Sequence, residues 1–208
     1  MILNEPLWQN FAARYELSEI QLAQFKKYYE LLQDWNERMN LTAITDEADV
    51  LAYHFVDSLK LAQFQDISQR TMLADIGTGA GFPGIPLKIK YPHVSVILVE
   101  VVQKKVSFLE EVIKELGLMD IQIYSQDWRT FLRHTDFPVD LVCSRASLHT
   151  DELLRMFQPS SPYKNAQLVY WASADWHARD HEMKFLTREE SYDVGERMRR
   201  YIFFNNKV

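Results

Sequence analysis

Apolar residues recur at helical spacing through the first part of the chain. Between residues 20 and 39 they stand mostly three or four positions apart, and Ser18 followed by Gln21 forms a capping-box pattern where this stretch begins. A second helix is predicted to begin near Thr45 or Asp46 and to continue to about Ala62. The pattern therefore predicts a helical N-terminal cap over residues 1–68.

From residue 71 the pattern changes to short apolar runs separated by amphipathic stretches. One helix is predicted over residues 102–116, where Gly117 ends it. Strands are predicted over residues 71–77, 93–100, 120–125 and 138–144, and less regular ones over 166–172 and 198–206. Alternating strands and helices predict an α/β fold with an open, doubly wound, mostly parallel sheet over residues 69–208. We expect this domain and the cap to pack as one compact unit.

Composition and charge exclude several classes of protein. The 208 residues are 47% hydrophobic with a net charge of -6, and Cys143 is the only cysteine, so neither a disulfide framework nor a thiolate zinc cluster is expected. Apolar runs do not approach the roughly 18 residues of a membrane span. His177 and His181 have metal-ligand spacing, but without an evident third ligand we expect surface histidines and no metal. A monomeric cytoplasmic protein is predicted.

Four of the six glycines lie in the segment ADIGTGAGFPGIP, residues 74–86. A P-loop is excluded, because Ile85 and Pro86 stand where it needs lysine and serine or threonine. A dinucleotide loop fits the letters from Gly79 to Gly84, but that match is displaced from the predicted strand and contains Pro83. A tight turn without a ligand and an S-adenosylmethionine loop are the other two interpretations.

Two acidic residues favour S-adenosylmethionine. Asp75 ends the first predicted strand, where a nicotinamide site usually has an apolar residue because a diphosphate approaches. Glu100 ends the second strand, about 20 residues past the loop, where a carboxylate can accept ribose hydroxyls in either kind of site. The alternating glycines Gly77, Gly79 and Gly81 would let the backbone pass close to a methionine moiety.

Several segments resemble the bacterial 16S rRNA guanine-N7 methyltransferases, also called glucose-inhibited division protein B. The glycine loop continues as Gly-Phe-Pro-Gly-Ile-Pro-Leu, and the acid of the second strand is followed by a lysine pair and Phe-Leu. Further similar segments are WNERMNLTAI at 35–44, YHFVDSL at 53–59, CSRA at 143–146 and the Gly-Glu-Arg ending. Departures are Glu100, where the family usually has aspartate, and the end of the fifth strand, where Trp171, Ala172 and Ser173 replace Lys-Gly.

The resemblance implies a Rossmann-like seven-stranded methyltransferase fold that binds S-adenosylmethionine. It also implies methylation of guanine N7 in 16S rRNA, either free or in the 30S subunit. N7 carries a lone pair and no proton, so positioning and electrostatics suffice without a general base. The site residues expected on this basis are Gly77, Gly79 and Gly81 for methionine, Asp75 for the loop or ammonium, Phe82 beside the cofactor, Glu100 for ribose, Asp127, Trp128 and Arg129 for adenine, and Arg145 near the methyl-transfer centre.

Structural roles remain open for several of these residues. Asp127 would also serve as a helix cap, Trp128 as a core residue, and His54 with Asp57 as a buried hydrogen-bonded pair. Basic residues that would contact RNA include Lys88, Lys90, Lys104, Lys105, Arg129, Arg145, Arg197, Arg199 and Arg200. Two alternative functions are a small-molecule methyltransferase and a cofactor-binding relative that has lost rRNA methylation.

Overall fold

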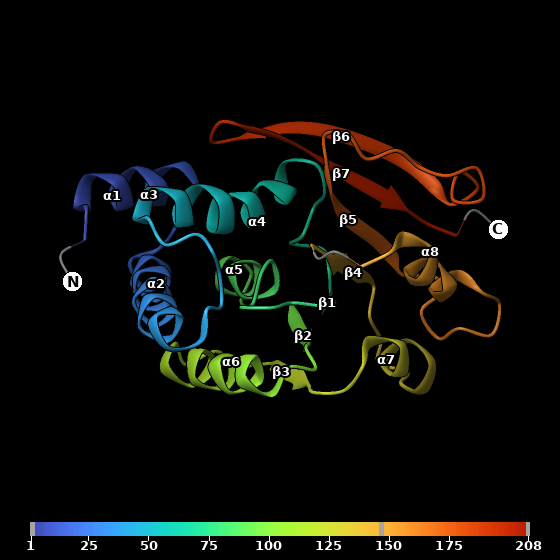
Figure 1. Ribbon diagram of the computed structural model, residues 1–208, viewed down its shortest axis with the longest axis horizontal. Coiled ribbons are helices and arrows are strands. Elements are labelled where there is room, and N and C mark those ends of the chain that lie inside the picture. The colour runs from blue at the N-terminus through green and yellow to red at the C-terminus, as the bar shows by residue number, and fades with distance from the viewer. Residues whose placement is uncertain (1–2, 146–147, 207–208) are drawn as a thin grey trace.

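A seven-stranded sheet in the order β3-β2-β1-β4-β5-β7-β6 forms the centre of the computed structural model, which describes residues 3–145 and 148–206 (Figure 1). The strands from β3 to β5 pair in parallel, and β7 runs antiparallel to both of its neighbours. The strand bounds are β1 Met72–Ile76, β2 Ser95–Val99, β3 Ile121–Tyr124, β4 Leu141–Ser144, β5 Gln167–Ser173, β6 Leu186–Val194 and β7 Arg197–Phe204. The predicted α/β class and mostly parallel sheet are confirmed.

Helices cover both faces of this sheet, as the alternating pattern predicted. Figure 1 shows α5 and α6 on the side of the N-terminal helices, and α7 and α8 on the other side. The helices that connect the parallel strands are α5 Gly84–Lys90, α6 Gln103–Glu115, α7 Trp128–His134, α8 Thr150–Leu153 and the 3-10 helix η3 Leu154–Phe157. In the described ranges, none of the helices has the length and apolar character needed to cross a bilayer.

Neighbouring residues of the central strands point to opposite faces and so build two hydrophobic clusters. Leu73 and Leu98 belong to the cluster shared with the cap, α5 and α6, whereas Ala74 and Ile97 belong to the cluster under α7 and η3. All four side chains are 0 or 1% exposed. Because β1 lies between β2 and β4, the chain reverses its winding direction there, and ligands of such sheets bind at this point.

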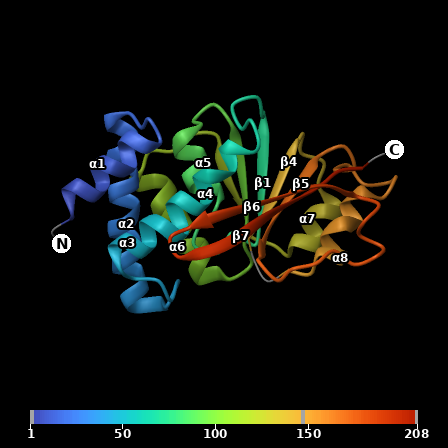
Figure 2. The ribbon, with the colours of Figure 1, turned by 90° about the horizontal axis from the view of Figure 1, so that it is seen from above.

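The N-terminal cap consists of two long helical stretches and a shorter first helix (Figure 2). Its elements are α1 Glu5–Arg14, α2 Glu19–Met39, α3 Glu47–Val50, the π-helix η1 Leu51–Val56, α4 Asp57–Leu59 and the 3-10 helix η2 Lys60–Gln63. The capping box of Ser18 and Gln21 is confirmed, and Asp46 caps α3. Most of its buried hydrophobic residues, from Trp8 onward, share one cluster with the sheet.

Strand β6 is absent from the predicted elements. Its sequence LTREESYDV buries only Tyr192 and Val194, near one end, and it forms the outer edge of the sheet beside β7. An edge strand that exposes charged side chains avoids pairing with other chains, but it lacks the apolar run that marks a buried strand. For this reason the hydrophobic pattern could not reveal it.

Candidate functional site

The glycine-rich loop leaves the carboxyl end of β1 and leads into α5. The N–H groups of Gly77 and Thr78 both donate to the carbonyl of Val99, at 3.0 and 3.2 Å, so the loop is held against the end of β2. Gly77, Gly79 and Gly81 all have positive φ, at 72°, 63° and 98°. Side chains other than hydrogen are disfavoured in that conformation, which explains the alternating glycines.

The glycines of the loop have different surroundings. A Cβ on Gly79 would meet no atom within 4 Å, so this residue borders open space. A Cβ on Gly81 would lie 2.5 Å from Cδ1 of Ile85 and 2.6 Å from the hydroxyl of Tyr28, and one on Gly84 would lie 2.5 Å from Leu98. Gly79 therefore offers room for a ligand, whereas Gly81 and Gly84 allow close packing of the cap and of α5.

Asp75 fixes the loop through two hydrogen bonds. Its Oδ2 accepts hydrogen bonds of 2.7 Å from the Thr78 hydroxyl and from the N–H of Gly84, while Oδ1 is buried without a partner in the described part of the chain. Burial raises the pKa of Asp75 to about 6, despite these two hydrogen bonds. The unsatisfied Oδ1 and the space above Gly79 fit a ligand that carries an ammonium group, as S-adenosylmethionine does.

Glu100 faces the loop from the end of β2. Its Oε1 accepts from the N–H groups of Val101 and Val102, at 3.0 and 2.9 Å, and its Oε2 accepts from Gly79 at 3.1 Å. Lys105 lies 3.8 Å from the same carboxylate, which is 7% exposed. A carboxylate offers about four acceptor positions, so Oε2 keeps one for a hydroxyl donor such as ribose.

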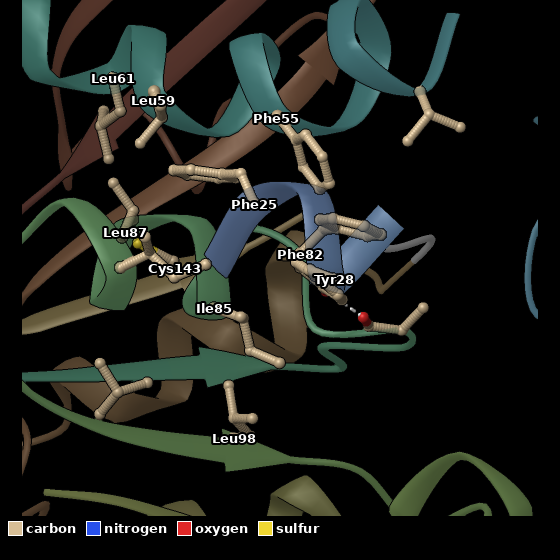
Figure 3. Close-up of a cluster of buried hydrophobic side chains, with 14 of the residues drawn as sticks. Phe25, Tyr28, Phe55, Leu59, Leu61, Phe82, Ile85, Leu87, Leu98 and Cys143 are labelled. Atoms are coloured by element: carbon tan, nitrogen blue, oxygen red, sulfur yellow. Dashed lines mark hydrogen bonds between the residues drawn. The ribbon is translucent and has the colours of Figure 1, made fainter. Parts of the chain in front are cut away.

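Phe82 lies between the loop and the cap. Its ring stacks on His54 with centroids 4.4 Å apart and on Tyr28 at 5.3 Å, and the guanidinium of Arg145 lies 5.0 Å from its centre. Tyr28 also donates its hydroxyl to the carbonyl of Ala80. Figure 3 shows Tyr28 and Phe82 together between the cap and the central strands. Phe82 is 4% exposed, so it joins the loop to the cap. Sequence reasoning missed Tyr28, which the pattern marked only as a helix core residue.

Arg145, at the end of β4, directs its side chain toward the cap. The guanidinium donates to the carbonyl of Tyr53 at 3.0 Å, to Oδ2 of Asp57 at 3.1 Å and to Nδ1 of His54 at 3.2 Å. Burial and the positive charge of Arg145 lower the pKa of His54 to about 3, so its ring is neutral. His54 and Asp57 are both buried as expected. The N–H of Asp57 donates to the carbonyl of His54, and Arg145 binds both side chains. Ala146, in the similar segment 143–146, lies outside the described residues.

The backbone and carboxylate of Asp57 also bind the carboxyl-terminal strands. Its Oδ1 accepts from the hydroxyl of Tyr192 at 2.7 Å, and its carbonyl accepts from Tyr201 at 2.9 Å and from Nε1 of Trp171 at 3.4 Å. Trp171 is one of the residues that depart from the pattern of the family. At this position tryptophan connects β5 to the cap, a contact that only the folded chain reveals.

The segment after β3 is engaged in local contacts. Asp127 accepts from the N–H of Arg129 at 2.8 Å and so caps α7, as the structural alternative predicted. Trp128 is 9% exposed and belongs to the cluster under α7, which agrees with its alternative role in the core. Arg129 forms ion pairs with Asp127 and with Glu152. Their contribution to an adenine site stays a prediction.

Lys88 does not belong with the basic residues expected to contact RNA. It is 1% exposed, and its ammonium donates to the carbonyls of Pro92 and Val94 at 2.7 and 2.8 Å. Lys104 donates to the carbonyl of Met39 at 3.3 Å, and Arg200 pairs with Glu189. A lysine inside an amphipathic helix is usually exposed, so the sequence pattern carried no sign that Lys88 is buried.

His177 and His181 are both exposed, as predicted. His181 lies beside Asp151 and Glu182, and one ligand atom of each falls within 4.8 Å of the others. Arg179 already pairs with Asp151, and Glu182 accepts from the Thr150 hydroxyl and from the N–H of Arg179. Both carboxylates of this cluster therefore already have hydrogen-bond or ion-pair partners on the protein.

The chain matches the family model described as rRNA small subunit methyltransferase G over residues 21–201. It is 46% identical over 145 residues to the Ribosomal RNA small subunit methyltransferase G of Geobacillus sp. (strain WCH70), which covers 69% of this chain. The chain spans 61% of the length of that curated relative.

Solved structures share the fold at low identity. A human methyltransferase 10 domain containing protein superposes with a TM-score of 0.57 and 12% identity, covering 73% of this chain and 81% of its own. M. capricolum TrmK in complex with S-adenosyl-homocysteine has a TM-score of 0.56 and 15% identity, covering 73% and 68%. These similarities agree with the Rossmann-like methyltransferase fold expected from the sequence.

Proposed function

This chain belongs to the rRNA small subunit methyltransferase G family, and we propose that it methylates N7 of a guanine in the 16S rRNA of the small ribosomal subunit, using S-adenosylmethionine. The observation that carries the proposal is the pairing of the glycine loop with Glu100, in which the N–H of Gly79 donates to Oε2 at 3.1 Å. The open space at Gly79 and the carboxylate of Glu100, which would hold the ribose, lie together at the switch point of the sheet.

The proposed chemistry agrees with the residues of the site. S-adenosylmethionine would supply an electrophilic methyl group on a sulfonium. Guanine N7 would form the new bond to the methyl group with its lone pair while the S–CH₃ bond breaks, so that S-adenosyl-homocysteine leaves and no proton is released. The protein would therefore have to orient the two reactants and match the moving positive charge. Glu100 would hold the ribose, Asp75 would hold the loop and the ammonium, and Gly79 would allow the close approach.

Arg145 would act at the acceptor end through the cap. Its guanidinium lies over Phe82 and is bound by Tyr53, His54 and Asp57. We propose that this network fixes the wall of the site against which the guanine is placed. The assay also tests two alternative functions, which are a small-molecule methyltransferase and a relative that has lost rRNA methylation.

The test is methyl transfer from labelled S-adenosylmethionine. Purified protein is incubated with undermethylated 30S subunits and, separately, with protein-free 16S rRNA, and the modified base is mapped by chemical cleavage at N7-methylguanine. Label at one guanine N7 in either substrate is the expected result, and the two arms identify the natural substrate. Absence of label from N7 in both, with S-adenosylmethionine binding intact by calorimetry, would refute the proposed acceptor.

A further inference from the structure

A basic groove lies on the opposite face of the sheet from the cap. It is a cavity of about 310 Å³ between α7 and the segment formed by α8, η3 and residues 158–162. Figure 1 shows α7 and α8 next to each other, away from α1 and α2. Trp128, Arg129 and Arg133 line it from α7, and Glu152 and Arg155 line it from the other side. The glycine loop takes no part in its lining, and Trp128 and Arg129, which are predicted to lie beside the adenine of the cofactor, form the end of the groove nearest the cofactor site.

Positive charge predominates in this groove although the whole chain carries -6. Arg129 is neutralised, because it pairs with Asp127 and Glu152. Arg133 and Arg155 are exposed, and neither forms an ion pair with any residue of the two described ranges, 3–145 and 148–206. Two guanidinium groups are therefore free to bind an anion, and arginine binds phosphate through parallel hydrogen bonds.

The basic character continues past η3. A second, smaller cavity of about 160 Å³ shares Arg155 and Gln158 with the first one and is also lined by Lys184 and by Asp151, whose charge is paired with Arg179. Arg155 therefore stands at the boundary of two adjoining hollows, with Arg133 on one side and Lys184 on the other. Such a row suits an extended polyanion better than a single small ligand.

We propose that this groove binds the phosphodiester backbone of RNA next to the target guanine, an inference that rests on the proposed function. The groove begins at Trp128 and Arg129, directly after β3. Because β3 runs parallel to β1 and β2, its carboxyl end lies at the same edge of the sheet as the glycine loop and Glu100. An RNA strand that follows the groove thus reaches the reactive edge. The spacing of Arg129 and Arg133, one helical turn apart, is the sequence signal for this surface.

The proposal is tested by the salt dependence of RNA binding. A labelled 16S rRNA fragment is titrated with wild type and with the double variant Arg133→Ala/Arg155→Ala, and affinity is measured between about 50 and 200 mM salt. The double variant is expected to bind more weakly and to reduce the slope of log affinity against log salt by about 2, since each lost phosphate contact removes about 1. The variant Arg133→Lys/Arg155→Lys should retain most of the slope.

Arg14→Ala is the matched control, because Arg14 is exposed on the cap across the sheet from the groove. It should leave RNA affinity, slope and S-adenosylmethionine binding unchanged. An alanine double variant that binds RNA like Arg14→Ala, with methyl transfer intact, refutes the groove while the proposed function stands. If RNA binding depends on salt and on both arginines, but the wild type transfers no methyl group to the RNA, the groove is supported and the proposed function is refuted. Wild type that does not bind RNA at about 50 mM salt refutes the groove.

Discussion

Arg145 at the end of β4 and Asp57 in the cap form a buried ion pair, with Nη1 3.1 Å from Oδ2. Their side chains are 12% and 0% exposed. Tyr192 on β6 donates to the other carboxylate oxygen at 2.7 Å, and Arg199 on β7 lies 3.8 Å from it. One carboxylate therefore connects the cap, the centre of the sheet and the C-terminal hairpin.

Replacement of Asp57 is expected to destabilise the fold strongly. In Asp57→Asn the side chain keeps its size, but Arg145 is left with an uncompensated buried charge, a change that typically costs about 3–5 kcal/mol of unfolding free energy. Urea unfolding of the purified variant measures this loss. The control is Asp34→Asn, because Asp34 is 61% exposed and pairs with Arg38 on the surface of α2. That variant should lose less than about 1 kcal/mol, and equal losses would contradict the central role of Asp57.

Alanine at Gly79 and at Gly81 should give different defects. In Gly81→Ala the new methyl would lie 2.5 Å from Ile85 and 2.6 Å from Tyr28, so we expect a folding defect of about 1–3 kcal/mol or more. Gly79→Ala meets no atom within 4 Å and should lose only about 1–2 kcal/mol, from its positive φ. It should weaken S-adenosylmethionine binding about tenfold or more, since the methyl fills ligand space. Unfolding and calorimetry distinguish the two, and normal binding by Gly79→Ala would remove Gly79 from the site.

Glu100→Gln is expected to impair cofactor binding. The two oxygens of Glu100 accept from three backbone N–H groups. A glutamine has one oxygen and one NH₂ group, so in either orientation of the amide the NH₂ group faces a backbone N–H donor that it cannot accept from. Loss of a hydrogen bond to a charged group costs about 1.5–3 kcal/mol, or about tenfold to a hundredfold in affinity. Glu100→Asp keeps the charge and should bind more tightly than Glu100→Gln in calorimetry. The reverse order would show that the carboxylate does not hold the ribose.

Local patterns predicted the fold well, and they marked residues that the structure brings together around the glycine loop. Asp75, the glycine loop and Glu100 all lie within 26 residues of the chain, so spacing along the chain reports their spatial relation. The capping box of Ser18 and Gln21 is likewise a contact between residues three positions apart. Contacts of this range are encoded in short motifs.

The network around Arg145 and Asp57 depends on contacts that no local pattern contains. Arg145 lies 88 positions from Asp57 and 91 from His54, and Tyr192 lies 135 positions from Asp57. The family resemblance predicts Arg145 near the methyl-transfer centre, but the sequence contains no sign that its side chain is directed toward the cap. Arg133 and Arg155 lie on different elements, α7 and η3, which only the folded chain brings to one cavity, so no local pattern connects them.

Acidification should destabilise the fold through His54. Burial and Arg145 lower the pKa of His54 from 6.5 to about 3. Below pH about 6.5 the unfolded chain therefore binds a proton that the folded chain does not bind. The free energy of unfolding falls as the pH decreases from about 6.5 to about 3. Asp75 acts in the opposite sense, because its pKa is raised from 3.8 to about 6 and folding favours its protonated form in that window. In urea unfolding at pH 7 and at about pH 4.5, His54→Gln should lose less stability than wild type on acidification, and Asp75→Asn should lose more. An unchanged pH dependence in His54→Gln would show that the folded chain protonates His54 readily.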